Sequence, residues 1–287
     1  MKVIDIINGN KPSLSFEVFP PKTSEAVEQI TAATEKIAEL KPSYISVTYG
    51  AGGGTSDYTV MVASNIKKKF GVETVAHLSC ISSGKARVRA ELDKLRENGI
   101  ENILALRGDL PKDFNSENLE YHYASELVSE VKEYGGFCIG GACYPEGHPE
   151  SDSSINDIKH LKTKINAGCE YLTTQMFFDN NILYNFLYRL RESGVNVPVV
   201  AGIMPVTNPK SIRRICSISG TLLPQRFVRI VERYGGNADA MKQAGIAYAT
   251  EQIIDLFANG VNAVHIYSMD KPDVAARIAE NISEIIA

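Results

Sequence analysis

The hydrophobic positions of the chain fall into two kinds of segment that alternate. Short apolar runs rich in Val, Ile, Leu and Phe are typical of buried strands, and each is followed by a longer segment with the periodicity of an amphipathic helix. The strand-like runs are LSFEVF (14–19), YISVTYG (44–50), TVAHLSC (74–80), NILALRG (102–108), FCIGGACY (137–144), YLTTQMFF (171–178), VPVVAGIM (197–204) and AVHIYS (263–268). The helix-like segments cover residues 25–40, 58–70, 85–99, 121–135, 154–168, 181–194, 209–257 and 272–286.

Eight strand–helix units predict a (β/α)8 barrel. The strands are mostly continuous apolar runs, which is typical of parallel strands covered by helices. Such barrels usually take about 250 residues, and the surplus in this chain of 287 residues fits extra helix between the seventh and eighth strands. No linker divides residues 1–287, so we expect a single catalytic domain. A doubly wound sheet is the competing architecture, but Pro20-Pro21 occupy the place of its phosphate loop after the first strand.

Composition and charge narrow the class of protein. A hydrophobic content of 44% and a charged content of 22% are those of a globular protein, and a net charge of −4 with dispersed Lys and Arg gives no sign of a nucleic-acid partner. No apolar run approaches the roughly 20 residues of a membrane span, and the first residues lack a signal-peptide pattern. We therefore expect a cytoplasmic protein. Its five cysteines form no CxxC, and we expect buried free thiols rather than disulfides or metal ligands.

Polar residues stand near the ends of seven of the eight predicted strands. In a (β/α)8 barrel these positions meet at the C-terminal face, where catalytic groups lie. Strand seven offers only Met204 and Pro205. The polar positions are Glu17, Thr48, Tyr49, His77, Arg107, Gly108, Asp109, Tyr144, Glu146, His148, Thr174, Gln175, His265 and Tyr267. Ordinary strand termination also produces such residues, but their number favours a common mouth that binds a polar ligand.

Glu17 lies between Phe16 and Phe19 in SLSFEVFPPKT. Burying an ionised carboxylate among aromatic rings costs several kcal/mol unless it is paired or protonated. Pairing with Arg107 would make Glu17 structural, whereas a raised pKa would suit a general acid at neutral pH. His77 has two interpretations as well, as a core histidine or as a ligand contact. The residues alone predict a barrel enzyme with an acid–base mouth.

Eight motifs have the order and spacing seen in methylenetetrahydrofolate reductases. They are FEVFPPKT, ISVTYGAGG, AHLSC, LALRGDLP, YPEGHPE, TTQMFFD, GIMPVTN and HIYSM. The resemblance runs from about residue 13 to residue 270, and FE-x-FPP, RGDLP and YPE-x-HPE are specific as a set. It implies a barrel with FAD at its C-terminal face. A nicotinamide cofactor, NADH or NADPH, would reduce the flavin, and 5,10-methylenetetrahydrofolate would then take its place and become 5-methyltetrahydrofolate, a ping-pong reaction that feeds methionine biosynthesis.

The resemblance also implies roles for individual residues. Glu17 would be the general acid that protonates N10 of the folate, so that the ring opens to a 5-iminium ion, and Asp109 would favour that cation. Gln175, Tyr267 and Lys271 would contact the folate or the nicotinamide. The implied FAD contacts are Thr48, Tyr49, Ala51, His77, Arg107, Gly108, Asp109, Tyr144, His148, Asp157 and Lys164. No metal is implied.

Three positions depart from the family pattern, all on the expected nicotinamide side. Ser211 stands where some bacterial relatives carry Gln, Ile215 where an aromatic covers the nicotinamide, and Lys271 where Arg is often found. The chain ends just after its eighth predicted helix, so we expect no adenosylmethionine-binding regulatory domain. Bacterial members of the family usually form homo-oligomers, and we expect the same here.

Three alternatives remain open at this point. A reductase of an acetogenic branch would depend on a partner protein or ferredoxin instead of free NADH. A metal-dependent barrel lyase would use His77, Cys80 and His148. A non-catalytic pterin-binding module would bind folate without turnover.

Overall fold

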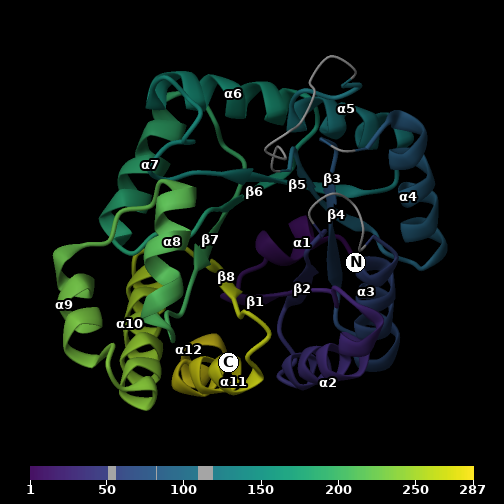
Figure 1. Ribbon diagram of the computed structural model, residues 1–287. Helices are drawn as coiled ribbons and strands as arrows, with labels where there is room; N and C mark the ends of the chain where they lie inside the picture. Colours follow the sequence, from purple (N-terminus) through teal and green to yellow (C-terminus); the bar gives the residue numbers. More distant parts are fainter. Residues whose placement is uncertain (51–55, 82, 109–118) are drawn as a thin grey trace.

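The computed structural model describes residues 1–50, 56–81, 83–108 and 119–287 (Figure 1). Eight parallel strands pair in sequence order, and β8 pairs with β1 to close a barrel. The predicted (β/α)8 fold is confirmed. The strands are β1 (Ser13–Val18), β2 (Tyr44–Val47), β3 (Thr74–Ser79), β4 (Asn102–Leu106), β5 (Cys138–Cys143), β6 (Tyr171–Thr174), β7 (Val199–Ile203) and β8 (Ala263–Tyr267).

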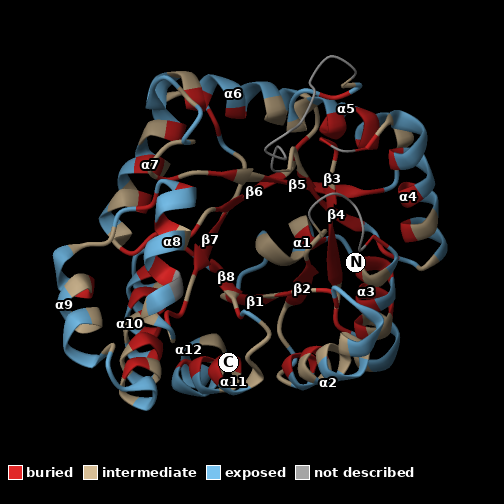
Figure 2. Ribbon diagram, in the orientation of Figure 1, coloured by how far each residue is buried: buried red, intermediate tan, exposed pale blue. Residues whose placement is uncertain are grey.

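Helices follow the strands and cover the outside of the barrel. They are α2 (Val27–Ala38), α3 (Ser56–Phe70), α4 (Lys85–Glu97), α5 (Ala124–Tyr134), α6 (Ser154–Asn166), α7 (Asn180–Glu192) and α11 (Pro272–Asn281), with a 3-10 turn η1 (Ser24–Ala26) before α2 and a short α12 (Ser283–Ile286) after α11. Strands and inner helix faces are buried, whereas the outer helix faces are exposed (Figure 2). The main hydrophobic core therefore lies between the strands and the helices.

Several strands are shorter than the apolar runs predicted. β6 ends at Thr174, although the run continues to Phe178. Beyond the strand, Met176 and Phe178 pack in a separate cluster with Ile212 and Phe227, so these side chains are apolar because they support the rim of the barrel. An apolar run alone does not show whether its residues continue the strand or pack in a cluster beyond the strand end.

The stretch 209–257 contains three helices rather than one. α8 (Pro209–Ser219) ends at Gly220, whose φ of 71° is left-handed, and α9 (Gln225–Tyr234) begins after Pro224. α10 (Ala238–Ala258) is capped by the side chain of Asn237, which accepts hydrogen bonds from two backbone N–H groups. α10 packs against β7, and α9 lies on the outside of α10 (Figure 1).

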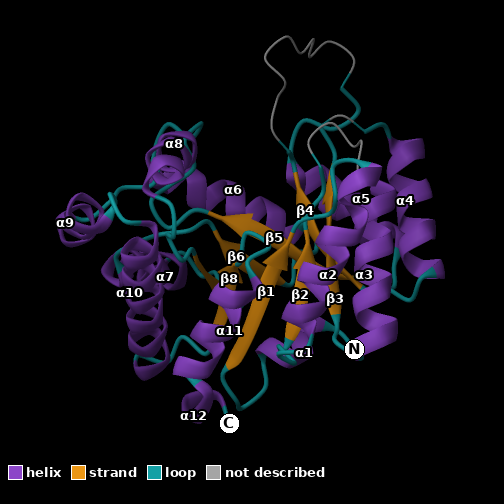
Figure 3. Ribbon diagram, turned by 60° about the horizontal axis from the view of Figure 1, so that its bottom comes forward, coloured by secondary structure: helices purple, strands orange, loops and turns teal. Residues whose placement is uncertain are grey.

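A short helix that the sequence pattern did not predict, α1 (Val3–Ile7), closes the end of the barrel where the strands begin (Figure 3). The backbone N–H of Val3 donates to Oδ1 of buried Asn102 at 2.7 Å, and Val3 packs against Tyr44, Leu104 and Tyr171 inside the barrel. Only the opposite end of the barrel therefore remains for a ligand to enter.

Two further properties concern the class of protein. All five cysteines are buried and free, as predicted. None of the helices in the described part of the chain is long and apolar enough to cross a membrane.

Candidate active site

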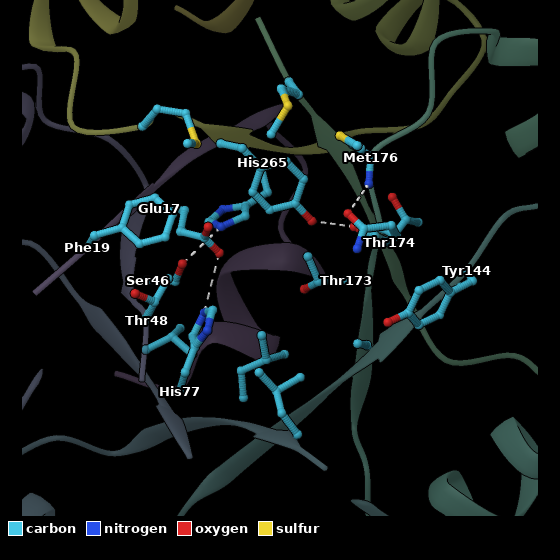
Figure 4. Close-up of a pocket in the computed structure, with 18 of the residues that line it drawn as sticks. Glu17, Phe19, Ser46, Thr48, His77, Tyr144, Thr173, Thr174, Met176 and His265 are labelled. Atoms are coloured by element: carbon cyan, nitrogen blue, oxygen red, sulfur yellow. Dashed lines mark hydrogen bonds and ion pairs between the residues drawn. The ribbon is translucent and has the colours of Figure 1, made fainter. Parts of the chain in front are cut away.

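A cavity of about 520 Å³ lies at the C-terminal end of the barrel, among side chains from seven of the strands and the loops that follow them (Figure 4). Eight of the polar positions predicted at strand ends line it. They are Glu17, Thr48, His77, Tyr144, Thr174, Gln175, His265 and Tyr267. The remaining lining side chains include Phe19, Tyr44, Ser46, Tyr171, Met176, Met204, Ile215 and Met269.

Strand geometry explains which residues reach the cavity. Side chains two apart on a strand share a face. Tyr44 and Ser46 on β2, and Thr48 directly after it, all line the cavity. Tyr49 points to the other face and packs against the core between strands and helices. The same period could have identified Ser46 and Tyr171 from the sequence. It gives no signal for Phe19 or Met269, which stand on loops.

Glu17 is the largely buried acid that the sequence predicted, with its side chain 12% exposed. Burial raises its pKa to about 8, and the negative charge of Asp270 adds to the effect. Its Oε2 lies 3.7 Å from Nε2 of His77. A guanidinium partner would lower this pKa, so the ion pair with Arg107 that would have made Glu17 structural receives no support. Arg107 instead forms a bidentate pair with Glu150, at 2.5 and 2.7 Å.

Two buried histidines next to Glu17 are neutral at physiological pH. Burial lowers the pKa of His77 and of His265 to about 3. Ser15 donates its hydroxyl to the carbonyl of Val264, so its oxygen accepts from Nδ1 of His265 at 2.8 Å, and Nε2 then accepts from Ser46 at 2.9 Å. This arrangement fixes one neutral tautomer of His265.

A glycine explains why β7 offers no polar side chain to the cavity. The hydroxyl of Tyr267 on β8 reaches across β7 and donates to the carbonyl of Thr174 on β6. A Cβ on Gly202 of β7 would lie 2.4 Å from that carbonyl oxygen and 2.5 Å from the Tyr267 hydroxyl. Gly202 therefore leaves the space through which the tyrosine passes.

Four predicted cofactor residues surround the cavity on the β4–β6 side without lining it. Nδ1 of His148 accepts from the N–H of Glu150, the partner of Arg107, and the N–H of His148 donates to buried Asp157 at 3.4 Å. The His148 ring stands edge-on to Tyr144 at 4.6 Å. Lys164 donates to the carbonyl of Ala142 at 2.7 Å.

These residues fit the cofactor that the resemblance implies. Burial lowers the pKa of Lys164, whose ammonium has three donors and uses one on Ala142. A Cβ on Gly141 would lie 2.7 Å from Cδ of Lys164, so the glycine makes room for the lysine. Arg107, His148 and Lys164 together are a donor set suited to a pyrophosphate, and the Tyr144 ring suits a planar group. These residues could hold FAD.

The remaining predicted positions lie elsewhere. Lys271 does not line the cavity, and its Nζ donates to Thr207 on the loop after β7 at 2.6 Å. Gly108 has a φ of 89°, and a Cβ there would collide with Ser79. Ala51 and Asp109 are outside the described residues. Ile215 lines the cavity, as the nicotinamide position was expected to.

The lyase alternative requires three ligands that come together. Among the described residues, no group of three His, Cys, Asp or Glu side chains could hold a metal ion. The fold therefore does not unite His77, Cys80 and His148 in a metal site. The thiol of Cys80 instead faces the carbonyls of Arg107 and Tyr123.

One solved structure of similar fold is an uncharacterized protein from Clostridium thermocellum that binds two copies of 5-methyl-5,6,7,8-tetrahydrofolic acid. Its TM-score is 0.70 over 99% of this chain and 100% of that one. At 15% sequence identity, this likeness shows the fold alone.

Sequence comparison reaches further. The 5,10-methylenetetrahydrofolate reductase of Pectobacterium carotovorum is 34% identical over 94% of this chain and 90% of its own length. Methylenetetrahydrofolate reductase (NADH) 1 of Arabidopsis thaliana is 33% identical over 99% of this chain, which spans 51% of the plant protein. The family model described as methylenetetrahydrofolate reductase matches residues 2–283. The chain therefore belongs to the methylenetetrahydrofolate reductase family.

Proposed function

We propose that the protein is a flavin-dependent reductase that converts 5,10-methylenetetrahydrofolate to 5-methyltetrahydrofolate with electrons from NADH or NADPH. The observation that carries the proposal is Glu17, a buried acid in the cavity whose pKa is raised to about 8. Reduction of this substrate needs a proton donor at neutral pH. An ordinary surface glutamate is ionised there and has no proton to donate.

Glu17 acts first, as the general acid. Its carboxyl proton goes to N10 of the bound folate, the bond from N10 to the bridging carbon breaks, and the 5-iminium ion that remains accepts a hydride more readily than the closed ring. Glu17 is left as a carboxylate and must take up a proton before the next turnover. A general acid contributes most when its pKa is near the working pH, and the value of about 8 meets that condition.

The neighbours of Glu17 keep its proton from being lost to another base. His77 and His265 both have a pKa of about 3, because burial disfavours their cations. A protonated histidine beside Glu17 would favour its carboxylate form and so lower the pKa of the carboxyl group. The buried imidazoles are neutral, so Glu17 stays protonated until the substrate arrives.

The β4–β6 side of the cavity would hold FAD through Arg107, His148 and Lys164, with Tyr144 against its planar part. Bound FAD supplies a hydride carrier that links nicotinamide oxidation to folate reduction. Gln175 lines the same cavity and would hydrogen-bond the pterin. Its Oε1 accepts from the N–H of Met176 at 2.9 Å, which orients the amide so that its NH2 group remains for a ligand.

One observation favours a second candidate, the reductase that depends on a partner protein. Ile215 lines the cavity where the resemblance places an aromatic side chain over the nicotinamide. An aliphatic side chain stacks less well on a planar ring. Weak nicotinamide binding would then leave electron delivery to a partner protein or ferredoxin.

Absorbance spectroscopy of the purified protein tests both candidates. We expect flavin bands in the protein as isolated, bleaching by NADH or NADPH, and recovery of the bands on addition of 5,10-methylenetetrahydrofolate. Bleaching by dithionite but by neither nicotinamide, with no NADH oxidation when menadione is the acceptor, would favour the partner-dependent reductase. Folate binding without recovery of the bands would contradict both and indicate a pterin-binding module.

A further inference from the structure

The loop between β8 and α11 makes hydrogen bonds at the end of β1, next to Glu17. Ser268 donates its hydroxyl to the carbonyl of Glu17 at 2.5 Å. Two residues further on, Oδ1 of Asp270 accepts from the backbone N–H of Phe19 at 2.9 Å. The loop thus holds the backbone just after the Glu17 side chain, at the carbonyl of Glu17 and at the N–H of Phe19.

The same loop is also tied to the neighbouring loop after β7, and it has an unusual backbone conformation. Lys271 donates to Thr207 on the loop after β7. Met269 and Asp270 have φ values of 53° and 52°, in the left-handed region that L-residues adopt only at a cost in conformational energy. Consecutive strained residues persist where surrounding contacts enforce them, and such strain is frequent at functional sites.

We propose that Asp270 is a positioning residue for the acid chemistry of Glu17: it holds the end of β1 and places a carboxylate where its negative charge disfavours ionisation of Glu17. This inference rests on the proposed role of Glu17 as general acid. Burial raises the pKa of Asp270, and the hydrogen bond from Phe19 opposes that effect by stabilising the carboxylate form.

The other groups facing Glu17 leave this role to Asp270 within the described part of the chain. From β3, His77 is neutral because burial lowers its pKa to about 3, and from β8, His265 is neutral for the same reason. Burial keeps the pKa of Tyr267 well above its usual range, so the phenol is uncharged too. Lys271, the cation that follows Asp270 in the chain, donates its ammonium hydrogen bond to Thr207 and not to Asp270 or Glu17.

Asp270→Asn separates the charge of Asp270 from its hydrogen bond. The asparagine keeps a carbonyl oxygen for the Phe19 N–H but carries no charge, whereas Asp270→Ala loses both. Asp273→Asn is the matched control, because Asp273 lies three residues later in the first turn of α11, is exposed and pairs with Lys242. The three variants are compared with the wild type. The Glu17→Gln variant identifies the spectral band of Glu17, because it lacks that carboxyl group.

Infrared difference spectroscopy of the carboxyl C=O band reports protonation of Glu17 without any turnover. We expect its titration midpoint to fall by about one pH unit in Asp270→Asn and to be unchanged in Asp273→Asn. The single-turnover rate of folate reduction should then fall about 5-fold at pH 8 and little at pH 6, because fewer Glu17 side chains remain protonated. Flavin reduction by the nicotinamide should not change.

The two readouts distinguish failure of the inference from failure of the proposed function. An unchanged midpoint in Asp270→Asn, or an equal loss of rate at every pH in the Asn and Ala variants, would overturn the role of Asp270. A shifted midpoint in a protein that does not reduce the folate at all would leave the electrostatic coupling intact and overturn the proposed reaction instead.

Discussion

The two sides of the cavity treat charge in opposite ways. On one side lie β1, β2, β3 and β8, and we call this side the acid wall (Glu17, Ser46, His77 and His265). Its ionisable groups are buried and held neutral, and no cation pairs with them within the residues that the structure describes. On the side of β4, β5 and α6, which we call the cation rim (Arg107, His148 and Lys164), Arg107 pairs with Glu150, and Asp157 lies near His148 and Lys164.

The acid wall and the cation rim differ in charge because each would act on a different group, a folate nitrogen that needs a proton and an anionic cofactor. A carboxyl group keeps its proton at neutral pH only if water and cations are absent, so the acid wall uses neutral hydroxyls and imidazoles as partners. An anionic cofactor needs positive charge and hydrogen-bond donors. In the cation rim the Arg107 guanidinium pairs with Glu150. Burial lowers the pKa of His148 and of Lys164, and the nearby charge of Asp157 opposes that effect. Figure 4 shows Glu17 and Tyr144 on opposite sides of the same cavity. One cavity therefore combines two electrostatic environments.

The largest effect is expected from removing the proton of the acid wall. Glu17→Gln keeps the size and polarity of the side chain but cannot act as an acid. We expect the rate of folate reduction in single turnover to fall at least about 10³-fold, because ring opening depends on the proton. Reduction of the flavin by NADH or NADPH should survive, because the residues of the cation rim are unchanged. An equal fall in both half-reactions would show that Glu17 is structural.

The next largest effect is expected at the cation rim. Lys164→Met keeps most of the side-chain length and removes the ammonium, and we expect the dissociation constant of FAD to rise about 10- to 100-fold, as for loss of a charge-assisted hydrogen bond. The dissociation constant can be measured from the fluorescence of the FAD that is released when the protein is diluted. Lys162→Met, an exposed lysine on the same helix, is the control. A Lys164 variant that retains FAD like the control would remove the cation rim from cofactor binding.

The fold was accessible from the sequence because each unit repeats one pattern, an apolar run followed by an amphipathic segment. Boundaries were less accessible. The run after Thr174 continues with apolar residues that pack under α8, and the helical periodicity of 209–257 hides two breaks near Gly220 and Gly235. The order of apolar and polar residues in a short stretch of sequence does not predict which hydrophobic cluster an apolar side chain joins.

The site was partly accessible for a related reason. Strand ends and period two place Glu17, Thr48 and His77 in the mouth, and the structure confirms that they line it. Asp270 gave no signal, because it follows a strand by three residues and its role depends on a loop that returns to β1. Contacts between the first and last strands are fixed by closure of the barrel, and a local pattern cannot predict them.

A smaller effect is expected on stability, and it sharpens the description of the acid wall. The folded state holds the Glu17 proton up to a pKa of about 8, whereas a glutamate in the unfolded chain has a pKa of about 4.5. Between these values the unfolded state binds fewer protons, so stability falls as pH rises. From pH 6.5 to 7.5 the loss is about 1 kcal/mol. His77 and His265, whose pKa values are lowered by burial, contribute an opposite slope that both proteins share. Urea unfolding at both pH values should therefore show the loss in the difference between wild type and Glu17→Gln.

The smallest effect is expected at Tyr267, where the two sides of the cavity meet. Its hydroxyl is committed to the carbonyl of Thr174, so Tyr267→Phe removes a buried hydrogen bond and leaves that carbonyl with one fewer donor. We expect a loss of about 1 kcal/mol in unfolding free energy. The ring remains in place beside Gly202, so KM for the folate and for the nicotinamide should change less than about 3-fold. A large rise in KM for one of them, without loss of stability, would show that the hydroxyl leaves Thr174 to bind that ligand, and Tyr267 would then be a recognition residue rather than a brace between β6 and β8.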